Sequence, residues 1–255
     1  MLKSERQDAL ARLTDELRTL TVRDAAERLD ISEMTVRRDF DELAEQGRVR
    51  RVRGGARTCS QGRSLTISRE FTRTEKQLLH VEEKRAIGRA AAELVDEGDT
   101  LFLGNGTTVE AMAAELPDCR LRIVTNSLPI FSTLDERADI ELFLLGGLYR
   151  PGTGALVGPI AEEALANMGL AKAFVGVNGI HENKAFASNM EACALQRAAL
   201  EAADRRYLLA DASKFDRRDF FSFYDLDDLT AIVSDPGLAD EARASAEQYT
   251  TVLGA

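Results

Sequence analysis

Cysteine, histidine and long apolar runs are all scarce in this sequence of 255 residues. The three cysteines, Cys59, Cys119 and Cys193, are widely spaced and odd in number, so they offer neither a disulfide framework nor a zinc-binding pattern. The two histidines, His80 and His181, have no cysteine and no second histidine at ligand spacing. We therefore expect no metal site, and no motif indicates a cofactor.

No apolar stretch approaches the roughly 18 residues that a membrane-spanning helix needs, so we expect no membrane partner. The first eight residues are charged and lack the apolar centre of a signal peptide, which predicts a cytoplasmic protein. Hydrophobic residues make up 44% of the chain. That share is enough for a sizeable core and excludes a disordered protein.

Positive charge is also scarce. The 33 basic and 43 acidic residues give a formal net charge of −10, which at first argues against a nucleic-acid partner. The charge is unevenly distributed, however, because residues 1–58 carry 13 basic and 12 acidic side chains whereas residues 59–255 carry 20 and 31. Residues 48–57 contain five arginines and no acid. A basic strip of this kind can bind phosphates on an otherwise acidic protein.

The beginning of the chain predicts three helices and a small hairpin. The expected elements are helices over residues 3–18, 21–29 and 32–47 and strands over residues 48–53 and 56–58. Thr21 and Ser32 are typical helix N-caps, and Gly54 with Gly55 provides the turn between the strands. This order predicts a winged helix-turn-helix domain over residues 1–58. The small polar residues that follow predict a linker over residues 59–68.

The third helix directs polar residues away from its apolar face. Val36 and Phe40 share the core side, whereas Ser32 and Thr35 point roughly away from it. A recognition helix presents its N-terminal residues to base edges in this way, although the helix taken alone also fits an ordinary surface helix. The arginine-rich hairpin favours DNA binding, because guanidinium groups suit the sugar-phosphate backbone. The expected DNA-binding residues are Ser32, Met34, Thr35, Arg37, Arg38, Arg48, Arg50, Arg51, Arg53, Gly54 and Gly55.

Beyond residue 68 the sequence alternates between strands and helices. A helical region near residues 70–96 precedes short apolar runs that end in glycine, asparagine, serine or aspartate, which is typical of a parallel sheet covered by helices. The expected strands are residues 100–103, 121–125, 140–145, 173–177, 207–210 and 231–233. We therefore predict a larger α/β domain over residues 69–255.

Polar clusters follow three of the expected strands. In residues 104–108, Gly-Asn-Gly-Thr-Thr, glycines let the backbone approach an anion, and threonine hydroxyls stand at a helix N-terminus. A tight turn with helix capping explains this loop equally well. Residues 125–127 and 211–214 follow two further strands, and the last of these clusters ends in Lys214. Because ligands gather at the carboxyl ends of strands in open α/β sheets, we expect one shared pocket in which Lys214 meets a phosphate.

The third helix and the hairpin together resemble the DNA-binding motif of the DeoR family of bacterial sugar-metabolism repressors. The resemblance lies in Ser32, Met34 to Phe40, Leu43, Gly47 and Gly54-Gly55-Ala56, with Arg53 where the family usually has histidine. It spans roughly residues 5–58 and implies a repressor that binds operator DNA. Such a protein holds two wings at two half-sites, so we expect a homo-oligomer, either a dimer or a tetramer.

Residues 75–255 are similar to the effector domain of that family, which resembles ribose-5-phosphate isomerase and related phosphosugar-binding folds. Within the family, residues 99–110 and 219–223 most resemble the lactose phosphotransferase-system repressors. The resemblance implies a phosphorylated sugar as effector, with tagatose 6-phosphate or a related hexose phosphate as the first candidate. It also shows departures, since Asn178 replaces an aspartate, and Gly104-Asn105-Gly106 an Asp-Ser-Gly, of many relatives. The expected effector-binding residues are Gly104, Asn105, Gly106, Thr107, Thr108, Thr125, Asn126, Ser127, Gly146, Gly147, Asn178, Glu191 and Lys214.

Two other functions are compatible with parts of the sequence. A sugar-phosphate isomerase with an appended DNA-binding domain would need a carboxylate base and a group that stabilises an enediolate. Glu191 and Lys214 could take those roles, but Asn178 removes one acid that such enzymes use, so we expect no enzymatic activity. A metabolite-binding protein without DNA function is the remaining alternative, and a gel shift with operator DNA distinguishes it.

Overall fold

The computed structural model describes residues 3–17, 19–46, 48–58 and 71–255. Contacts divide the chain into two compact units, residues 1–64 and 65–255. The linker predicted over residues 59–68 lies outside the described residues. Within the described part of the chain, no helix is both long and apolar enough to cross a membrane.

The N-terminal unit contains three helices followed by a hairpin, as predicted. Its elements are α1 (Lys3–Leu17), β1 (Thr19–Thr21), α2 (Val22–Leu29), α3 (Glu33–Glu45), β2 (Val49–Val52) and β3 (Gly55–Thr58). The hydroxyls of Thr21 and Ser32 accept hydrogen bonds from the amides of Asp24 (3.1 Å) and Thr35 (3.2 Å), so each residue caps its helix. The sequence does not predict β1, because three residues that run directly into a helix carry no periodicity. This strand pairs with β3 and completes a three-stranded sheet in the order β1-β3-β2.

One apolar core holds this unit together. Val36, Phe40 and Leu43 on α3 are fully buried, as the helical spacing predicts, and they cluster with Leu10 of α1 and Leu20 of β1. Burial of these side chains fixes α3 against the rest of the unit and leaves its opposite face to solvent.

The hairpin between β2 and β3 requires glycine at two positions. Gly54 has a φ of 83°, a left-handed conformation that favours glycine, and a Cβ atom on Gly55 would lie 2.2 Å from the carbonyl oxygen of Leu20. Both residues therefore have a structural reason to be glycine, besides the DNA contact predicted for them.

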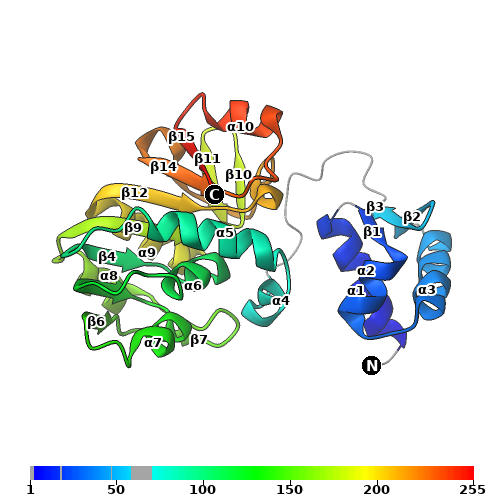
Figure 1. Ribbon diagram of the computed structural model, residues 1–255, viewed down its shortest axis with the longest axis horizontal. Helices are drawn as coiled ribbons and strands as arrows, with labels where there is room; N and C mark the ends of the chain where they lie inside the picture. Colours follow the sequence, from blue (N-terminus) through cyan, green and yellow to red (C-terminus); the bar gives the residue numbers. More distant parts are fainter. Residues whose placement is uncertain (1–2, 18, 47, 59–70) are drawn as a thin grey trace. The chain divides into compact units, whose positions relative to one another are not determined.

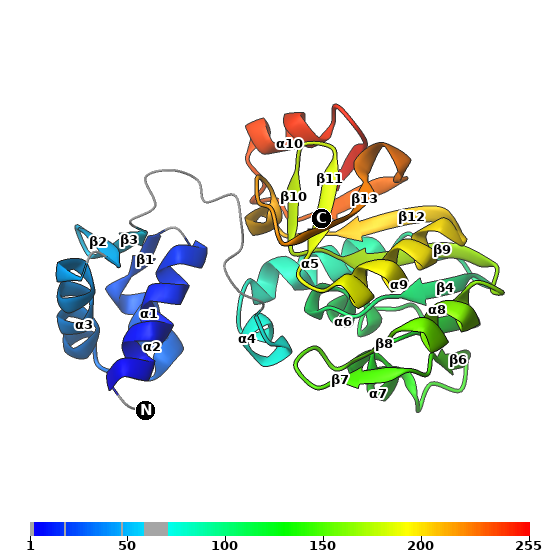
Figure 2. The same cartoon turned by 180° about the vertical axis from the view of Figure 1, so that it is seen from behind.

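The C-terminal unit is built on a seven-stranded sheet in which all neighbouring strands are parallel (Figures 1 and 2). The strand order is β15-β14-β12-β9-β4-β5-β6. The strands are β4 (Thr100–Leu103), β5 (Leu121–Thr125), β6 (Ile140–Leu144), β9 (Leu170–Gly176), β12 (Ala203–Leu209), β14 (Ala231–Ser234) and β15 (Thr251–Gly254). The predicted parallel α/β architecture is confirmed. Strand β12 begins earlier than predicted, because Asp204 and Arg205 at its start are exposed and interrupt the apolar run.

Helices cover both faces of this sheet (Figure 1). Helices α5 (Val81–Ala92), α6 (Thr107–Ala113) and α7 (Leu128–Leu134) pack on one face. Helices α8 (Pro159–Leu165), α9 (Met190–Glu201) and α10 (Asp240–Ala246) pack on the other. Each layer contributes buried apolar side chains to its own cluster, so the sheet lies between two cores.

The helical region predicted near residues 70–96 divides into two helices. Helix α4 (Arg73–Gln77) ends before His80, whose φ of 52° is left-handed and breaks the chain direction before α5 begins. The break turns α4 away from α5, and α4 lies beside α6 instead.

Short antiparallel strands flank the carboxyl edge of the sheet and were not expected from the sequence, because three- and four-residue strands carry little periodicity. They are the hairpin β7 (Leu148–Arg150) and β8 (Ala155–Val157) and the sheet formed by β10 (Gly179–His181), β11 (Lys184–Ala187) and β13 (Phe221–Asp225). Single turns of 3₁₀ helix, η1 (Ala212–Lys214) and η2 (Leu226–Asp228), complete the fold.

The direction of the strand order reverses between β4 and β9. From β4 the chain builds outward through β5 and β6, and from β9 it builds outward on the other side through β12, β14 and β15. In open α/β sheets this reversal opens a crevice at the carboxyl ends of the two central strands. The fold therefore places the expected binding site beside the loops that follow β4 and β9.

Candidate functional site

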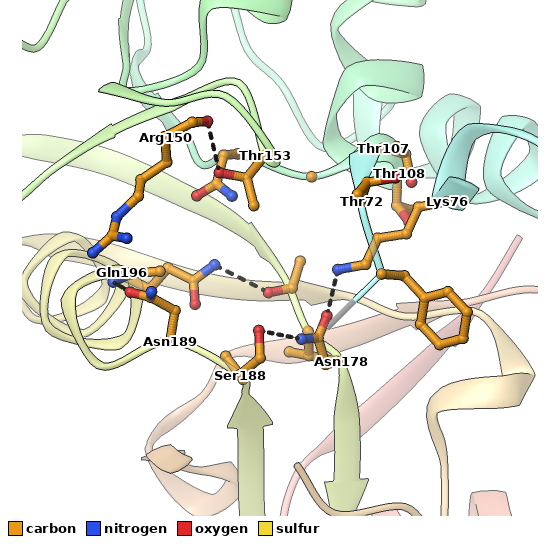
Figure 3. Close-up of a pocket in the computed structure, with 18 of the residues that line it drawn as sticks. Thr72, Lys76, Thr107, Thr108, Arg150, Thr153, Asn178, Ser188, Asn189 and Gln196 are labelled. Carbon is orange, nitrogen blue, oxygen red and sulfur yellow. Dashed lines mark hydrogen bonds between the residues drawn. The ribbon is translucent and has the colours of Figure 1, made fainter. Parts of the chain in front are cut away.

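A cavity of about 360 Å³ lies at this reversal, within the size range of small-molecule sites (Figure 3). The loops after β4 and β9 supply part of its wall, and further residues come from α4, α5, the start of α6, the end of β11, α9, η1 and the segment between β7 and β8. Its lining residues are Phe71, Thr72, Lys76, Lys84, Asn105, Gly106, Thr107, Thr108, Arg150, Pro151, Gly152, Thr153, Val157, Gly176, Val177, Asn178, Ala187, Ser188, Asn189, Ala192, Gln196 and Lys214.

The structure brings together about half of the residues expected to bind the effector. Those that line the cavity are Asn105, Gly106, Thr107, Thr108, Asn178 and Lys214. Those that do not are Gly104, Thr125, Asn126, Ser127, Gly146, Gly147 and Glu191. The carboxyl ends of β4, β9 and β12 therefore converge on one cavity, whereas the end of β5 lies behind it.

The cluster after β5 supports the loop that forms the wall. The amide of Asn105 donates to Oδ1 of Asn126 (3.1 Å), whose own Nδ2 donates to the carbonyl of Leu156 (3.1 Å). The Thr125 hydroxyl donates to the carbonyl of Leu103 (2.7 Å), and the Ser127 hydroxyl caps α7. These buried side chains are fully occupied by the protein, so they hold residues 104–106 in place.

Glu191 meets an arginine at the cavity wall. Its Oε2 atom accepts hydrogen bonds from Nε (3.1 Å) and Nη2 of Arg150. Arg150 itself lines the cavity, so this ion pair connects the β7–β8 segment to α9 across the site. The carboxylate that the sequence assigns to the effector is thus paired with a protein cation.

Asn178 is the centre of a polar network (Figure 3). Its Oδ1 accepts from Nζ of Lys76 (2.9 Å), and its Nδ2 donates to Oδ2 of Asp219 (2.7 Å) and to Oγ of Ser188 (3.3 Å). An aspartate at this position would face the buried carboxylate of Asp219, and two carboxylates at that separation repel each other. The structure therefore gives a physical reason for an asparagine at this position.

Lysines bring positive charge to the same cavity. Lys214 lies 3.7 Å from the buried carboxylate of Asp211, and Nζ of Lys84 donates to the carbonyls of Lys76 and Leu79. Burial opposes ionisation of Asp211, but the nearby charges and a hydrogen bond from Ser213 outweigh it, so the pKa of Asp211 lies below its ordinary value. Asp211 is therefore a carboxylate at neutral pH and holds Lys214 at the cavity.

Threonine hydroxyls lie in the same wall. Thr107 and Thr108 begin α6, and neither hydroxyl has a hydrogen-bond partner among the described residues. Both can donate to an anionic group in the cavity.

The sequence reasoning missed most of the α4, β7–β8 and α9 contributions. Thr72 and Lys76 come from α4, Arg150 and Thr153 from the β7–β8 segment, and Gln196 from α9. None of them follows a strand of the main sheet, which was the signal used. A polar Gln196 inside the apolar run of α9 is the one local clue that the sequence offers.

Helix α4 is tied to the cavity wall on two sides. Thr72 and Glu75 form a capping box, and the amide of Arg73 donates to the carbonyl of Gly152 (2.7 Å). The Arg73 guanidinium donates through Nε (2.8 Å) and Nη2 (2.9 Å) to the carboxylate of Glu110 on α6. These contacts hold α4 against the segment between β7 and β8 and against α6.

The face of α3 expected to contact bases is exposed. Met34 is 80% exposed, and Arg37 and Arg38 are exposed and pair only with acidic residues of their own helix, Glu33 (3.2 Å) and Glu42 (3.5 Å). Exposed pairs of this kind contribute little to stability, and a phosphate can displace the carboxylate. All these side chains are thus accessible to a nucleic acid.

The arginines of the β2–β3 hairpin differ in their surroundings. Arg48 pairs with Asp8 at the surface (2.8 Å), whereas Arg53 is exposed and has no partner among the described residues. Arg51 donates to Asp41 (2.7 Å) and to the carbonyl of Gly55 (2.6 Å). It therefore joins the hairpin to α3.

Among the residues that the structure describes, no group of three or more histidine, cysteine or carboxylate side chains could hold a metal ion. Cys193 is buried on α9. Burial raises the pKa of its thiol to about 11, and the negative charge of Asp219 also raises this pKa.

A winged helix-turn-helix unit and an α/β unit with a polar cavity define a class of protein, the transcription regulators that carry their own ligand-sensing domain. Residues 6–62 match the family described as the DeoR-like helix-turn-helix domain, and residues 79–236 match the DeoR C-terminal sensor domain. The chain therefore belongs to the DeoR family, as the resemblance implied, and its two domains are those of a regulator and not of an enzyme.

Relatives named as repressors match over nearly the whole chain. The lactose phosphotransferase system repressor of Streptococcus mutans is 38% identical over 255 residues, which cover 99% of this chain and 100% of the relative. The repressor of the same name from Lactococcus lactis is 40% identical over 240 residues, 93% of this chain and 92% of the relative.

Solved structures are similar to parts of this chain at low sequence identity. Ribose 5-phosphate isomerase A of Methanocaldococcus jannaschii is 17% identical, with a TM-score of 0.40 over 53% of this chain and 54% of its own. The delta subunit of eIF2B from Chaetomium thermophilum is 16% identical, with a TM-score of 0.44 over 60% and 55%. These scores are too low to support an argument about function.

Proposed function

We propose that this protein is a cytoplasmic repressor of sugar uptake or catabolism genes that a phosphorylated sugar releases from its operator. The observation that carries the proposal is the cavity at the strand reversal, where threonine hydroxyls and lysines meet amide side chains in a chain that also has an exposed recognition helix. The names of the relatives point to the lactose phosphotransferase system. Tagatose 6-phosphate, or a related hexose phosphate, is therefore the first candidate for the effector.

The two ends of such a ligand suit different walls of the cavity. A phosphate suits the side of Thr107, Thr108 and Lys214, which offers hydroxyl donors and a cation. Sugar hydroxyls suit the side of Asn178 and Ser188, whose amide and hydroxyl groups both donate and accept. The other expected residues, including Gly146, Gly147 and Glu191, would affect ligand binding indirectly, by holding the wall of the cavity in position.

At the other end of the chain, the exposed residues of α3 would contact base edges, and the hairpin would contact the backbone. We propose Ser32, Met34, Thr35, Arg37 and Arg38 for the first role, because they are accessible at the start of the helix. The second role falls to Arg48, Arg50 and Arg53 with Gly54 and Gly55, whereas Arg51 would hold the hairpin against α3.

The two sites would be coupled through α4. A ligand that hydrogen-bonds Asn178 competes with the ammonium group of Lys76, which now bonds that side chain. Release of Lys76 loosens α4, which also bonds the β7–β8 segment through Arg73 and Gly152. Effector and operator then bind antagonistically, with a typical coupling of about 5–150-fold.

Two copies of the chain would be needed to hold two half-sites about one helical turn, or a multiple of it, apart. The exposed apolar side chains Phe143, Leu148, Tyr149 and Ile160 lie on the edge strand β6, on β7 and on α8, and are suited to such a contact. Sedimentation at micromolar concentration would test this, and a monomer that still binds a palindromic operator cooperatively would contradict it.

The proposed function is tested by a thermal-shift screen of the full chain against pentose and hexose phosphates, followed by a gel shift with candidate operator DNA. A true effector at 100 times its Kd should stabilise the protein by about 2.7 kcal/mol, and the same compound should release the DNA. Turnover of any sugar phosphate would contradict the assignment as a regulator. Stabilisation without any effect on DNA would contradict the coupling.

A further inference from the structure

Gln196 has a buried polar atom that the protein does not satisfy. The residue lies on α9, is 6% exposed and lines the cavity (Figure 3). Its Nε2 donates to the carbonyl oxygen of Gly176 (3.3 Å), whereas its Oε1 has no hydrogen-bond partner among the described residues. Buried side-chain oxygens are hydrogen-bonded in the large majority of cases, so an unpaired one beside a cavity requires an explanation.

The orientation of this amide is fixed by its neighbour. A backbone carbonyl can only accept, so the nitrogen of Gln196 must face Gly176 and the oxygen must face elsewhere. The amide nitrogen is thus occupied by Gly176, and Oε1 is left without a partner in a residue that lines the cavity. Only a group that donates a hydrogen bond can satisfy this oxygen.

Among the components of a phosphorylated sugar, only the hydroxyl groups are such donors, because the phosphate oxygens accept at neutral pH. The lysines of the cavity only donate hydrogen bonds and suit the phosphate, whereas the buried oxygen of Gln196 can only accept one. We propose that Gln196 is a specificity-determining residue that accepts a hydrogen bond from one sugar hydroxyl. This inference rests on the proposed function and deepens it.

The experiment is a ligand series on the full chain by calorimetric titration, with tagatose 6-phosphate, galactose 6-phosphate, their monodeoxy analogues and inorganic phosphate as probes. One monodeoxy analogue should bind the wild-type protein about tenfold more weakly than its parent sugar phosphate. The near-isosteric substitution Gln196→Met should weaken the parent by a similar factor, and the variant should no longer distinguish the parent from that analogue. Binding of inorganic phosphate should change less than about twofold.

A matched control is Ser234→Ala, which removes another buried unpaired oxygen at a position that does not line the cavity. This variant should keep the full discrimination of the wild type. If Gln196→Met weakened inorganic phosphate as much as the sugar phosphates, or kept the discrimination at every hydroxyl, Gln196 would not determine specificity.

Two results in the wild-type protein distinguish failure of this inference from failure of the proposed effector, even where Gln196→Met fails to fold. If one sugar phosphate binds but no monodeoxy analogue loses affinity, the role of Gln196 is refuted and the proposed function stands. If neither sugar phosphate binds, these two candidates for the effector and this inference fail together.

Discussion

Asp39 lies on α3 directly after Arg37 and Arg38, which are proposed to contact DNA, yet its side chain is only 1% exposed. Its carboxylate accepts from Arg6 through Nε (2.6 Å) and Nη2 (3.2 Å) and from Nε2 of Gln7 (3.3 Å). Both partners are on α1, so this carboxylate joins the recognition helix to the first helix. We therefore expect Asp39→Ala to impair DNA binding through folding and not through a lost DNA contact.

The expected magnitude follows from what the substitution leaves behind. Removing one partner of a fully buried ion pair costs about 3–5 kcal/mol, and this figure is an upper bound here, because the side chain of Arg6 is 18% exposed and can turn toward solvent. A unit of 64 residues has a total stability of roughly 3–10 kcal/mol at ordinary values per residue. Asp39→Ala should therefore leave the N-terminal unit marginal or unfolded at 37 °C, while the C-terminal unit stays folded.

Calorimetry and circular dichroism of the full chain would measure this. The variant should show an early or missing transition for the N-terminal unit, an unchanged transition for the C-terminal unit, and effector binding as in the wild type. The control Asp8→Asn breaks the exposed pair with Arg48 and should change stability by less than about 1 kcal/mol. Equal, small effects of Asp39→Ala and Asp8→Asn would refute the reasoning.

The other predictions concern the hairpin, an acidic group and a thiol. Arg51→Ala should weaken operator binding but leave the slope of log K against log salt unchanged, because the Arg51 side chain bonds other parts of the protein. Arg53→Ala should reduce that slope by about one, measured by fluorescence anisotropy titrations at several salt concentrations. Because the pKa of Asp211 is lowered in the folded protein, its stabilising effect is fully present above about pH 4 and is lost as the pH falls through the folded pKa. The difference in unfolding free energy between the wild type and Asp211→Asn should therefore shrink on acidification, and a constant difference in urea titrations would contradict this. With a pKa of about 11, the thiol of Cys193 should resist iodoacetamide at pH 8 until the protein unfolds, and rapid labelling seen by mass spectrometry would show that the site opens.

Local patterns in the sequence predicted the elements that a single stretch of chain determines. The caps Thr21 and Ser32 and the buried face of α3 appear as expected, and every predicted strand of the main sheet is present, although β9 and β12 begin earlier than predicted. The loop after β4 could also be predicted to lie at the cavity, since the carboxyl ends of parallel strands share one edge. These features depend on helix periodicity, capping and strand burial, which are properties of neighbouring residues.

The rest of the candidate site depends on contacts between distant segments. Lys76 meets Asn178 across 102 positions, and Arg150 meets Glu191 across 41. No periodicity indicates that α4 turns back over the cavity, because the turn results from the left-handed conformation at His80. Likewise, nothing local distinguishes Arg51, which bonds the protein, from Arg53, which faces solvent. Sequence patterns therefore pointed to several loops of the candidate site but not to the segments that enclose it.

The central claim is that one equilibrium links the sugar-phosphate cavity to operator binding. The most direct measurement is the Kd of the effector, by titration calorimetry, for the free protein and for the protein saturated with operator DNA, beside the Kd of the DNA with and without effector. Linkage requires that both ratios have the same value, and we expect about tenfold or more. A hexose phosphate that binds the free and the DNA-bound protein with equal affinity would contradict the account.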